Sequence, residues 1–241
     1  MPSSPQLLDR MRHSNDTKGV GSQHNTLKKG FYIRHGKRVF DFVFSAIGLL
    51  ILSPLFVVVA MCIKFTSRGS VFFRQPRVGR GGQRFLIVKF RSMLQMASKM
   101  PPGITVSNDK RITRVGKILR RYKIDELPQL CNVLLGDMSF VGPRPELPEY
   151  VETYSVDQKL VFCVRPGITD PASLVYRNEE EILSESQDPE EIYRTEILPD
   201  KLARNLTYIQ NISFWNDLHI IFATLGQLFL SVKENPLRVG K

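Results

Sequence analysis

The uncharged apolar segment at residues 42–63 does most to limit what this chain can fold into. Its sequence is FVFSAIGLLILSPLFVVVAMCI, and no other apolar run in the chain is as long. A buried core helix of this length would normally show a polar face, and this segment shows none. Roughly 20 apolar helical residues are enough to cross a bilayer. The segment therefore predicts insertion into a membrane.

Two features argue against a simple span. Ser53 and Pro54 lie near the middle of the segment, where proline removes a backbone donor and kinks a helix. Each half then reaches only ~15 Å, about half of a ~30 Å hydrocarbon layer. Basic residues flank the segment: Arg34, Lys37 and Arg38 before it, and Lys64, Arg68 and Arg74 after it. Basic flanks favour the cytoplasmic side, and a re-entrant hairpin over 37–68 would place both flanks there. Prolines are also tolerated in membrane spans, so a kinked transmembrane helix is equally open at this point.

The remaining chain is basic and large enough for one domain. With 241 residues, a net charge of +11 and 42% hydrophobic residues, most of it can bury a core. The positive charge favours an anionic partner, which could be nucleic acid, anionic lipid or a polyphosphate substrate. Charge alone does not choose among these three.

Histidine and cysteine usage narrows the chemistry. No histidine falls between Gly36 and Leu218, which argues against a Ser-His-Asp triad or a histidine-bound zinc in the core. Cys62, Cys131 and Cys163 are far apart and form no CxxC motif, so we expect free thiols. An enzyme built from this chain would rely on carboxylates and basic groups.

The pattern along the chain predicts four regions and an α+β fold, mostly helical with a small β-sheet. They are a flexible basic tail at 1–36, the membrane segment at 37–68, a catalytic domain at 69–200, and an amphipathic helical region at 201–241. Short strands are expected at 71–73 and 85–88, separated by a glycine-rich turn. Helical spacing predicts a helix over 112–122 with a basic face, suited either to an anionic membrane surface or to plain solvation. The acidic segment 178–200 is expected to be solvated helix and loop.

Asp125 and Glu126 interrupt a basic stretch. From Lys64 through Lys123 the only carboxylate is Asp109, and such a segment repels itself unless an anion sits among its charges. We expect a helix to begin at Asp125 and to end near Gly136. An ionised aspartate beside a divalent metal can attack phosphorus or hold the metal. The alternative is an ordinary helix cap beside a solvent-facing glutamate.

Two arginine-proline turns follow the acidic pair. The first is GDMSFVGPRP at 136–145, which includes Gly142, Pro143 and Arg144, and the second is RPGIT at 165–169, which begins at Arg165. Neighbouring prolines fix the backbone of an arginine, which suits its planar guanidinium to bidentate phosphate binding. The alternative for each is a structural turn with a solvated arginine.

Taken together and in order, these blocks resemble the bacterial monotopic phosphoglycosyl transferases, also called bacterial sugar transferases. The resemblance covers roughly residues 37–230. The matching blocks are the apolar run with Ser53-Pro54, KFRSM at 89–93, DELPQL at 125–130, and the two arginine-proline turns. No single block would be specific, but the ordered set is.

The resemblance implies transfer of a phosphosugar from a UDP-sugar to polyprenyl (undecaprenyl) phosphate, with Mg²⁺, as the first step of membrane glycoconjugate synthesis. The reaction is expected at the cytoplasmic face of the bacterial inner membrane. The apolar segment would be a re-entrant hairpin broken at Ser53-Pro54, with amphipathic helices at the interface. Asp125 would be the nucleophile, forming a covalent phosphosugar-aspartate as UMP leaves. Glu126 would assist with metal or proton handling, and the two carboxylates would hold the metal.

The resemblance also implies which residues bind substrate. They are Lys89, Arg91, Arg120, Gly142, Pro143, Arg144 and Arg165. Arg120 stands where the family carries an arginine near the lipid head group. After RPGIT this chain has Asp170-Pro171-Ala172-Ser173 where many relatives have Gly-Trp-Ala-Gln, so the sugar stays open.

Two other functions compete with this interpretation. One is a different phosphoryl-transfer enzyme, with Glu126 as general base in a ternary complex. The other is a non-catalytic basic protein attached to the membrane through anionic lipid. Nucleic acid is disfavoured by the apolar run and by the lack of a recognisable binding module. The sequence does not decide whether the chain forms a homodimer.

Overall fold

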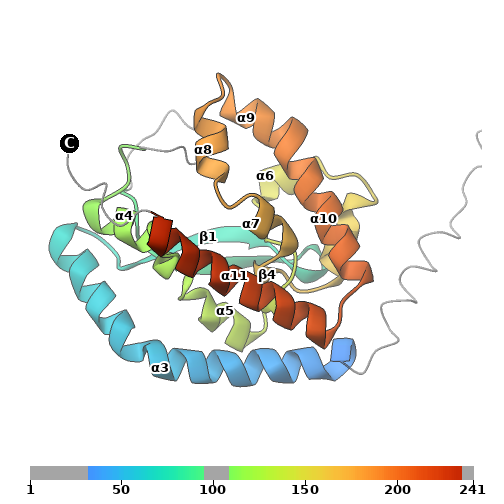
Figure 1. Ribbon diagram of the computed structural model, residues 1–241, viewed down its shortest axis with the longest axis horizontal. Coiled ribbons are helices and arrows are strands. Elements are labelled where there is room, and N and C mark those ends of the chain that lie inside the picture. The colour runs from blue at the N-terminus through green and yellow to red at the C-terminus, as the bar shows by residue number, and fades with distance from the viewer. Residues whose placement is uncertain (1–31, 95–108, 235–241) are drawn as a thin grey trace, which may run out of the picture.

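The computed structural model describes residues 32–94 and 109–234 (Figure 1). Most of the predicted tail and the last residues of the predicted C-terminal region therefore lie outside the described residues. Residues 32–36, which the sequence assigned to the tail, form a π-helical turn, η1 (Tyr32–Gly36), that runs into the next helix. The Tyr32 hydroxyl donates to Asp217 at 2.7 Å, so this turn is attached to a residue 185 positions later in the chain.

Helix α3 (Lys37–Thr66) contains the apolar segment. It is long and apolar enough to cross a membrane, and its most apolar 18-residue stretch has a mean hydropathy of 2.7 and is 11% buried. In Figure 1 it runs along the lower edge of the molecule and bends towards α4 (Arg114–Arg121). The predicted apolar membrane helix is thus present, and most of its apolar surface faces away from the protein.

The Ser53-Pro54 pair lies within this helix and does not end it. Pro54 has no N–H to donate to the carbonyl of Leu50, which is its partner in an α-helix. The Ser53 hydroxyl donates to that same carbonyl at 2.8 Å. The pair therefore removes one backbone hydrogen bond and replaces it with a side-chain bond, which matters where no water can satisfy the carbonyl.

Both halves of α3 are attached to the rest of the protein. Near its start, Asp41 is buried and accepts hydrogen bonds from the Ser139 hydroxyl and the Phe140 N–H, both at 3.0 Å. Near its end, Val59 and Ile63 pack in one cluster with Phe90 and Leu119. The apolar helix and the following domain therefore share core contacts.

The strands form two small sheets. β1 (Phe72–Val78) pairs antiparallel with β2 (Arg84–Phe90), and both are longer than predicted. The predicted glycine turn is the 3₁₀ turn η2 (Arg80–Gly82), where positive φ at Gly81 and Gly82 closes the hairpin. A second pair, β3 (Ser139–Val141) with β4 (Gly167–Thr169), is parallel and was not predicted. It joins the two arginine-proline turns.

The described residues are mostly helical, as predicted. The remaining elements are η3 (Ile124–Glu126), α5 (Gln129–Leu135), α6 (Pro148–Val151), η4 (Gln158–Cys163), α7 (Pro171–Val175), α8 (Glu179–Ser184), α9 (Pro189–Ile192), η5 (Tyr193–Ile197), α10 (Leu198–Gln210) and α11 (Phe214–Glu234). The helix predicted over 112–122 is α4, which begins after Thr113, whose hydroxyl accepts from Gly116 N at 2.8 Å. The three cysteines are free, as expected.

The prediction that 178–200 is merely solvated is wrong. Leu183, Tyr193, Ile197 and Leu198 are buried in the largest hydrophobic cluster of the described chain. The acidic residues alternate with these apolar ones, and high charge concealed the pattern. The segment therefore packs against α10, and its acidic residues are part of the folded domain.

Candidate active site

The backbone around Asp125 differs from the predicted helix start. Lys123 adopts the left-handed conformation with φ 54°, which reverses the chain after α4. The 3₁₀ turn η3 follows, and α5 begins only at Gln129, with Pro128 as its N-cap. Asp125 is therefore not the cap of an α-helix. It lies in a tight turn and is 6% exposed.

Glu126 is held by two cations. Its Oε1 accepts from Lys89 Nζ at 2.7 Å and from Arg144 Nη2 at 2.5 Å, and its Oε2 accepts from Arg144 Nη1 at 3.3 Å. Burial alone would raise the pKa of Glu126, but the charges of Arg144 and Lys89 outweigh burial and hold that pKa well below its usual value. Glu126 is therefore ionised and immobilised.

Asp125 has the opposite environment. Its Oδ1 is buried and finds no hydrogen-bond partner among the described residues. Burial, followed by the charge of Glu126, raises the pKa of Asp125, while Lys89 and Arg120 act against that rise. Two adjacent carboxylates with different environments are the usual basis for different chemical roles.

The two arginine-proline turns meet at Gly142. A Cβ atom there would lie 2.3 Å from the Arg165 carbonyl oxygen, so only glycine allows this approach. Gly167 N donates to the Pro143 carbonyl at 3.0 Å across the same contact. Gly142 and Pro143 therefore shape the backbone that carries Arg144.

Asp170 fixes Arg144 from behind. It is 1% exposed, and its Oδ2 accepts from the Arg144 backbone N–H at 3.0 Å. Its Oδ1 caps α7 by accepting from Ser173 N at 2.5 Å. From the sequence, Asp170 was interpreted only as a departure from the family pattern. Asp followed by Pro is a recognisable signal for the start of a helix, so the cap of α7 could have been predicted. Nothing in the sequence indicates the hydrogen bond to Arg144.

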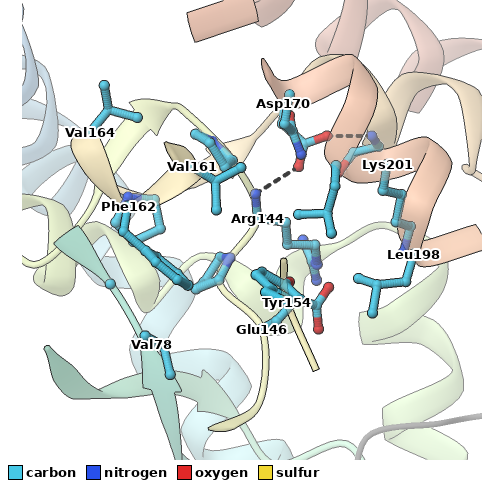
Figure 2. Close-up of a pocket in the computed structure, with 17 residues that line it drawn as sticks. Val78, Arg144, Glu146, Tyr154, Val161, Phe162, Val164, Asp170, Leu198 and Lys201 are labelled. Carbon is cyan, nitrogen blue, oxygen red and sulfur yellow. Dashed lines mark hydrogen bonds between the residues drawn. The ribbon is translucent and has the colours of Figure 1, made fainter. Parts of the chain in front are cut away.

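Figure 2 shows a pocket on this rear side of Arg144. Lys201 and Leu198 of α10 line it on the right in the figure, Asp170 lies above, and Val161 lies to the left. Neither Asp125 nor Glu126 is among its lining residues. The pocket therefore backs the loop that carries Arg144 and is separate from the acidic pair.

The other predicted substrate-binding residues divide into two groups. Arg120 forms an ion pair with Glu180 and lies close enough to Asp125 to influence its charge. Arg91 instead donates to the Ser67 carbonyl and hydroxyl, both at 2.8 Å. The structure thus gathers Lys89, Arg120 and Arg144 around the acidic pair, and Arg91 braces the end of α3.

Arg165 is not brought to the acidic pair. Its Nε donates to the Gly136 carbonyl at 2.7 Å, and its charged neighbours are Arg38, Arg80 and Asp41. Arg38 binds the Val133 and Leu134 carbonyls at 2.6 and 2.7 Å. Together the two arginines donate to carbonyls in the last turn of α5 and at Gly136 just after it.

The donor set near Asp125 fits magnesium. Mg²⁺ usually takes one or two carboxylates and completes its shell with water and substrate phosphates. The unpartnered, buried Oδ1 of Asp125 offers such a ligand, whereas both oxygens of Glu126 already have cationic partners. In the described ranges, no cluster of three or more His, Cys, Asp or Glu side chains could hold a metal ion by itself. Water and substrate oxygens would have to supply the remaining ligands.

Comparison with known proteins identifies relatives of this chain. The bacterial sugar transferase family matches residues 32–231. The chain is 39% identical over 194 residues to a UDP-N-acetylgalactosamine-undecaprenyl-phosphate N-acetylgalactosaminephosphotransferase of Aeromonas hydrophila, covering 78% of this chain and 42% of the relative. It is 39% identical over 199 residues to a UDP-glucose:undecaprenyl-phosphate glucose-1-phosphate transferase of Klebsiella pneumoniae, covering 81% and 40%.

A shorter relative matches over nearly its whole length. The exopolysaccharide production protein ExoY of Rhizobium meliloti is 35% identical over 212 residues, which cover 81% of this chain and 86% of the relative. The chain thus spans about two fifths of the first two relatives and most of the third. The family match includes α3, the acidic pair and both arginine-proline turns. This chain belongs to the bacterial sugar transferase family.

Proposed function

We propose that this protein transfers a sugar 1-phosphate from a UDP-sugar to polyprenyl phosphate, through a covalent phosphosugar on Asp125. The observation that carries the proposal is the contrast within the acidic pair. Among the residues that the structure describes, one buried oxygen of Asp125 has no hydrogen-bond partner, whereas both oxygens of Glu126 are engaged by Lys89 or Arg144. A carboxylate oxygen that is not engaged by a hydrogen bond and lies beside fixed cations is suited to attack a phosphorus atom.

In the first half-reaction, a carboxylate oxygen of Asp125 attacks the phosphorus that carries the sugar. The bond from that phosphorus to the bridging oxygen breaks, and UMP leaves with the electron pair. In the second, a phosphate oxygen of the polyprenyl phosphate attacks the same phosphorus and the Asp125 carboxylate leaves. Neither step requires a proton, so Glu126 acts by holding Arg144 and Lys89 in place.

The same cations serve both steps. Arg144 and Lys89 bear positive charge beside the position of the transferred phosphoryl group, where negative charge accumulates. Asp125 would also hold Mg²⁺ together with substrate oxygens. A bound Mg²⁺ would neutralise phosphate charge in each transfer.

UMP release without a lipid acceptor tests the two-step route. We expect a burst of about one equivalent of UMP per enzyme when purified protein meets its UDP-sugar alone, because the first half-reaction needs no acceptor. A panel of UDP-sugars in this assay also identifies the sugar. Mass spectrometry should place the sugar phosphate on Asp125. UMP release that begins only after undecaprenyl phosphate is added would contradict the covalent route and favour a ternary complex.

We further propose that α3 is a re-entrant hairpin in the bacterial inner membrane, with the acidic pair on the cytoplasmic side. The bend of α3, the Ser53-Pro54 pair and the basic flanks support it. Along α11, Trp215 and Phe222 are 75% and 62% exposed, which suits a helix lying at the membrane interface. An entering and returning helix would keep both lipid phosphate and nucleotide near one surface.

Labelling from one side of the membrane tests this topology. With the native cysteines replaced by serine, His35→Cys and Arg68→Cys should react from the same side of sealed vesicles with a membrane-impermeant maleimide. Pro54→Ala restores the N–H that can donate to Leu50, so it should straighten α3 and shift position 68 towards the opposite side. Opposite-side labelling in the protein that retains Pro54 would establish a full span instead.

A further inference from the structure

The acidic start of α8 reaches into the basic field around Asp125. Glu180 Oε1 accepts from Arg120 Nη2, and the neighbouring Glu179 pairs with Lys201 of α10. Lys201 is 7% exposed and lies over the Tyr193 ring, with its Nζ 5.0 Å from the ring centroid. The Glu179–Lys201 pair therefore fixes α8 to the core and leaves Glu180 beside Arg120.

Arg120 retains binding capacity that Glu180 does not use. Its Nε is buried and has no hydrogen-bond partner among the described residues. Within the described ranges, its Nη1 donates only to the Met93 sulfur, at 3.5 Å, which is a weak acceptor. A guanidinium has five N–H donors, and an unpaired buried donor favours any ligand that can accept from it. Arg120 is therefore incompletely satisfied by the described part of the chain.

Arg120 and Asp125 belong to one site. The Arg120 carbonyl accepts from Lys123 N at 3.1 Å, in the reversal that leads into η3. The Arg120 charge also acts against the rise in the pKa of Asp125. A ligand that accepted from Arg120 would thus lie close to the proposed nucleophile.

The two glutamates on site arginines differ in exposure. The Glu180 side chain is 42% exposed, whereas the Glu126 side chain is 13% exposed. The Arg120 side chain is 22% exposed, so water reaches mainly the Glu180 side of this pair. An ion pair with an exposed partner contributes little because water solvates that partner well. A buried one cannot lose a partner without leaving a charge uncompensated. Glu180 can therefore be exchanged for another anion far more readily than Glu126.

We propose that Glu180 is a displaceable counter-ion of Arg120. Glu180 pairs with Arg120 in the absence of substrate, and the phosphate of a substrate takes the place of Glu180 when it binds. This proposal rests on the proposed function, because that function supplies the phosphate groups. Glu180 then sets how tightly the site binds phosphate and does not itself take part in transfer. The carboxylate offers the guanidinium the same kind of acceptor oxygens as a phosphate does.

Equilibrium binding tests this role without turnover. Farnesyl phosphate stands for the lipid substrate and UMP for the nucleotide, each titrated by calorimetry into the full chain in detergent micelles. We expect Glu180→Gln to bind at least one of them about two- to fivefold more tightly, the range an exposed ion pair supports. Tighter binding of farnesyl phosphate alone assigns Arg120 to the acceptor, and tighter binding of UMP alone assigns it to the donor. Unchanged or weaker binding of both would overturn the proposal.

Two further variants separate this role from a structural one. Glu181→Gln removes the same charge from an adjacent, exposed position of α8, and we expect no change in binding. In an Arg120→Met background, Glu180→Gln should no longer alter binding, because the competition is for Arg120. A gain that persists without Arg120 would also overturn the proposal. Lack of UMP release from every UDP-sugar would count against the proposed function, while these titrations would still report on Glu180.

Discussion

Replacing Asp125 with asparagine should lower sugar phosphate transfer on the order of 10⁴-fold or more, the scale seen when an enzyme loses its nucleophile. The amide is similar in size but cannot form the phosphosugar-aspartate. The burst of UMP should disappear together with steady turnover. Both are measured with the same labelled UDP-sugar, in the presence and absence of undecaprenyl phosphate.

A matched control separates chemistry from charge. Asp157→Asn removes one carboxylate from an exposed position before η4 and should leave both phases of UMP release intact. Thermal unfolding should show that Asp125→Asn remains folded, because the amide replaces a carboxylate that burial disfavours. Turnover of Asp125→Asn within tenfold of the unmodified protein would assign the nucleophile elsewhere and return Glu126 to consideration as a general base.

The apolar helix and the acidic pair could be predicted from sequence because their signals are local. A run of 22 uncharged residues at 42–63 needs no distant partner to indicate a membrane helix. The hairpin of β1 and β2 could also be predicted, because glycine is the usual residue where a turn needs positive φ, and Gly81 and Gly82 adopt it. Lys123 has positive φ too, but lysine gives no such signal, so the turn before Asp125 was predicted as a helix start.

Partners that are far apart in sequence could not be predicted. Asp41 lies beside the apolar run, yet it binds Ser139 and Phe140, about 100 residues away. Arg144 and Arg165 have the same arginine-proline signature, but one binds Glu126 and the other binds the Gly136 carbonyl. The parallel pairing of β3 with β4 brings the two turns together, and no local sequence signal marks which arginine lies near the acidic pair.

The second large effect is expected for Glu126→Gln, on stability as well as on activity. The change leaves Lys89 and Arg144 without their shared anion at a buried position, and breaking such a pair costs about 3–5 kcal/mol. For a chain of this size that corresponds to a fall in Tm of roughly 10 °C. The measurement is thermal unfolding by circular dichroism in detergent, with EDTA present so that metal binding does not contribute.

An exposed pair provides the control for this loss. Arg204 and Asp200 form an ion pair with side chains 43% and 38% exposed, and Arg204→Gln should cost no more than about 1 kcal/mol. A similar loss for both variants would mean that Glu126 is solvated in solution and does not hold the two cations.

The pH dependence of this loss follows from the direction of the pKa shift. The pKa of Glu126 is lower in the folded protein than in the unfolded chain, because Arg144 and Lys89 outweigh burial. Its contribution to stability is therefore complete at pH values above the unfolded pKa, and it is lost as pH falls through the folded pKa. The Tm difference between the unmodified protein and Glu126→Gln should stay constant from neutral pH down to roughly pH 5 and shrink only in stronger acid. A difference that shrank between pH 7 and pH 6 would show that the pKa of Glu126 is raised, as burial without effective cationic partners would cause.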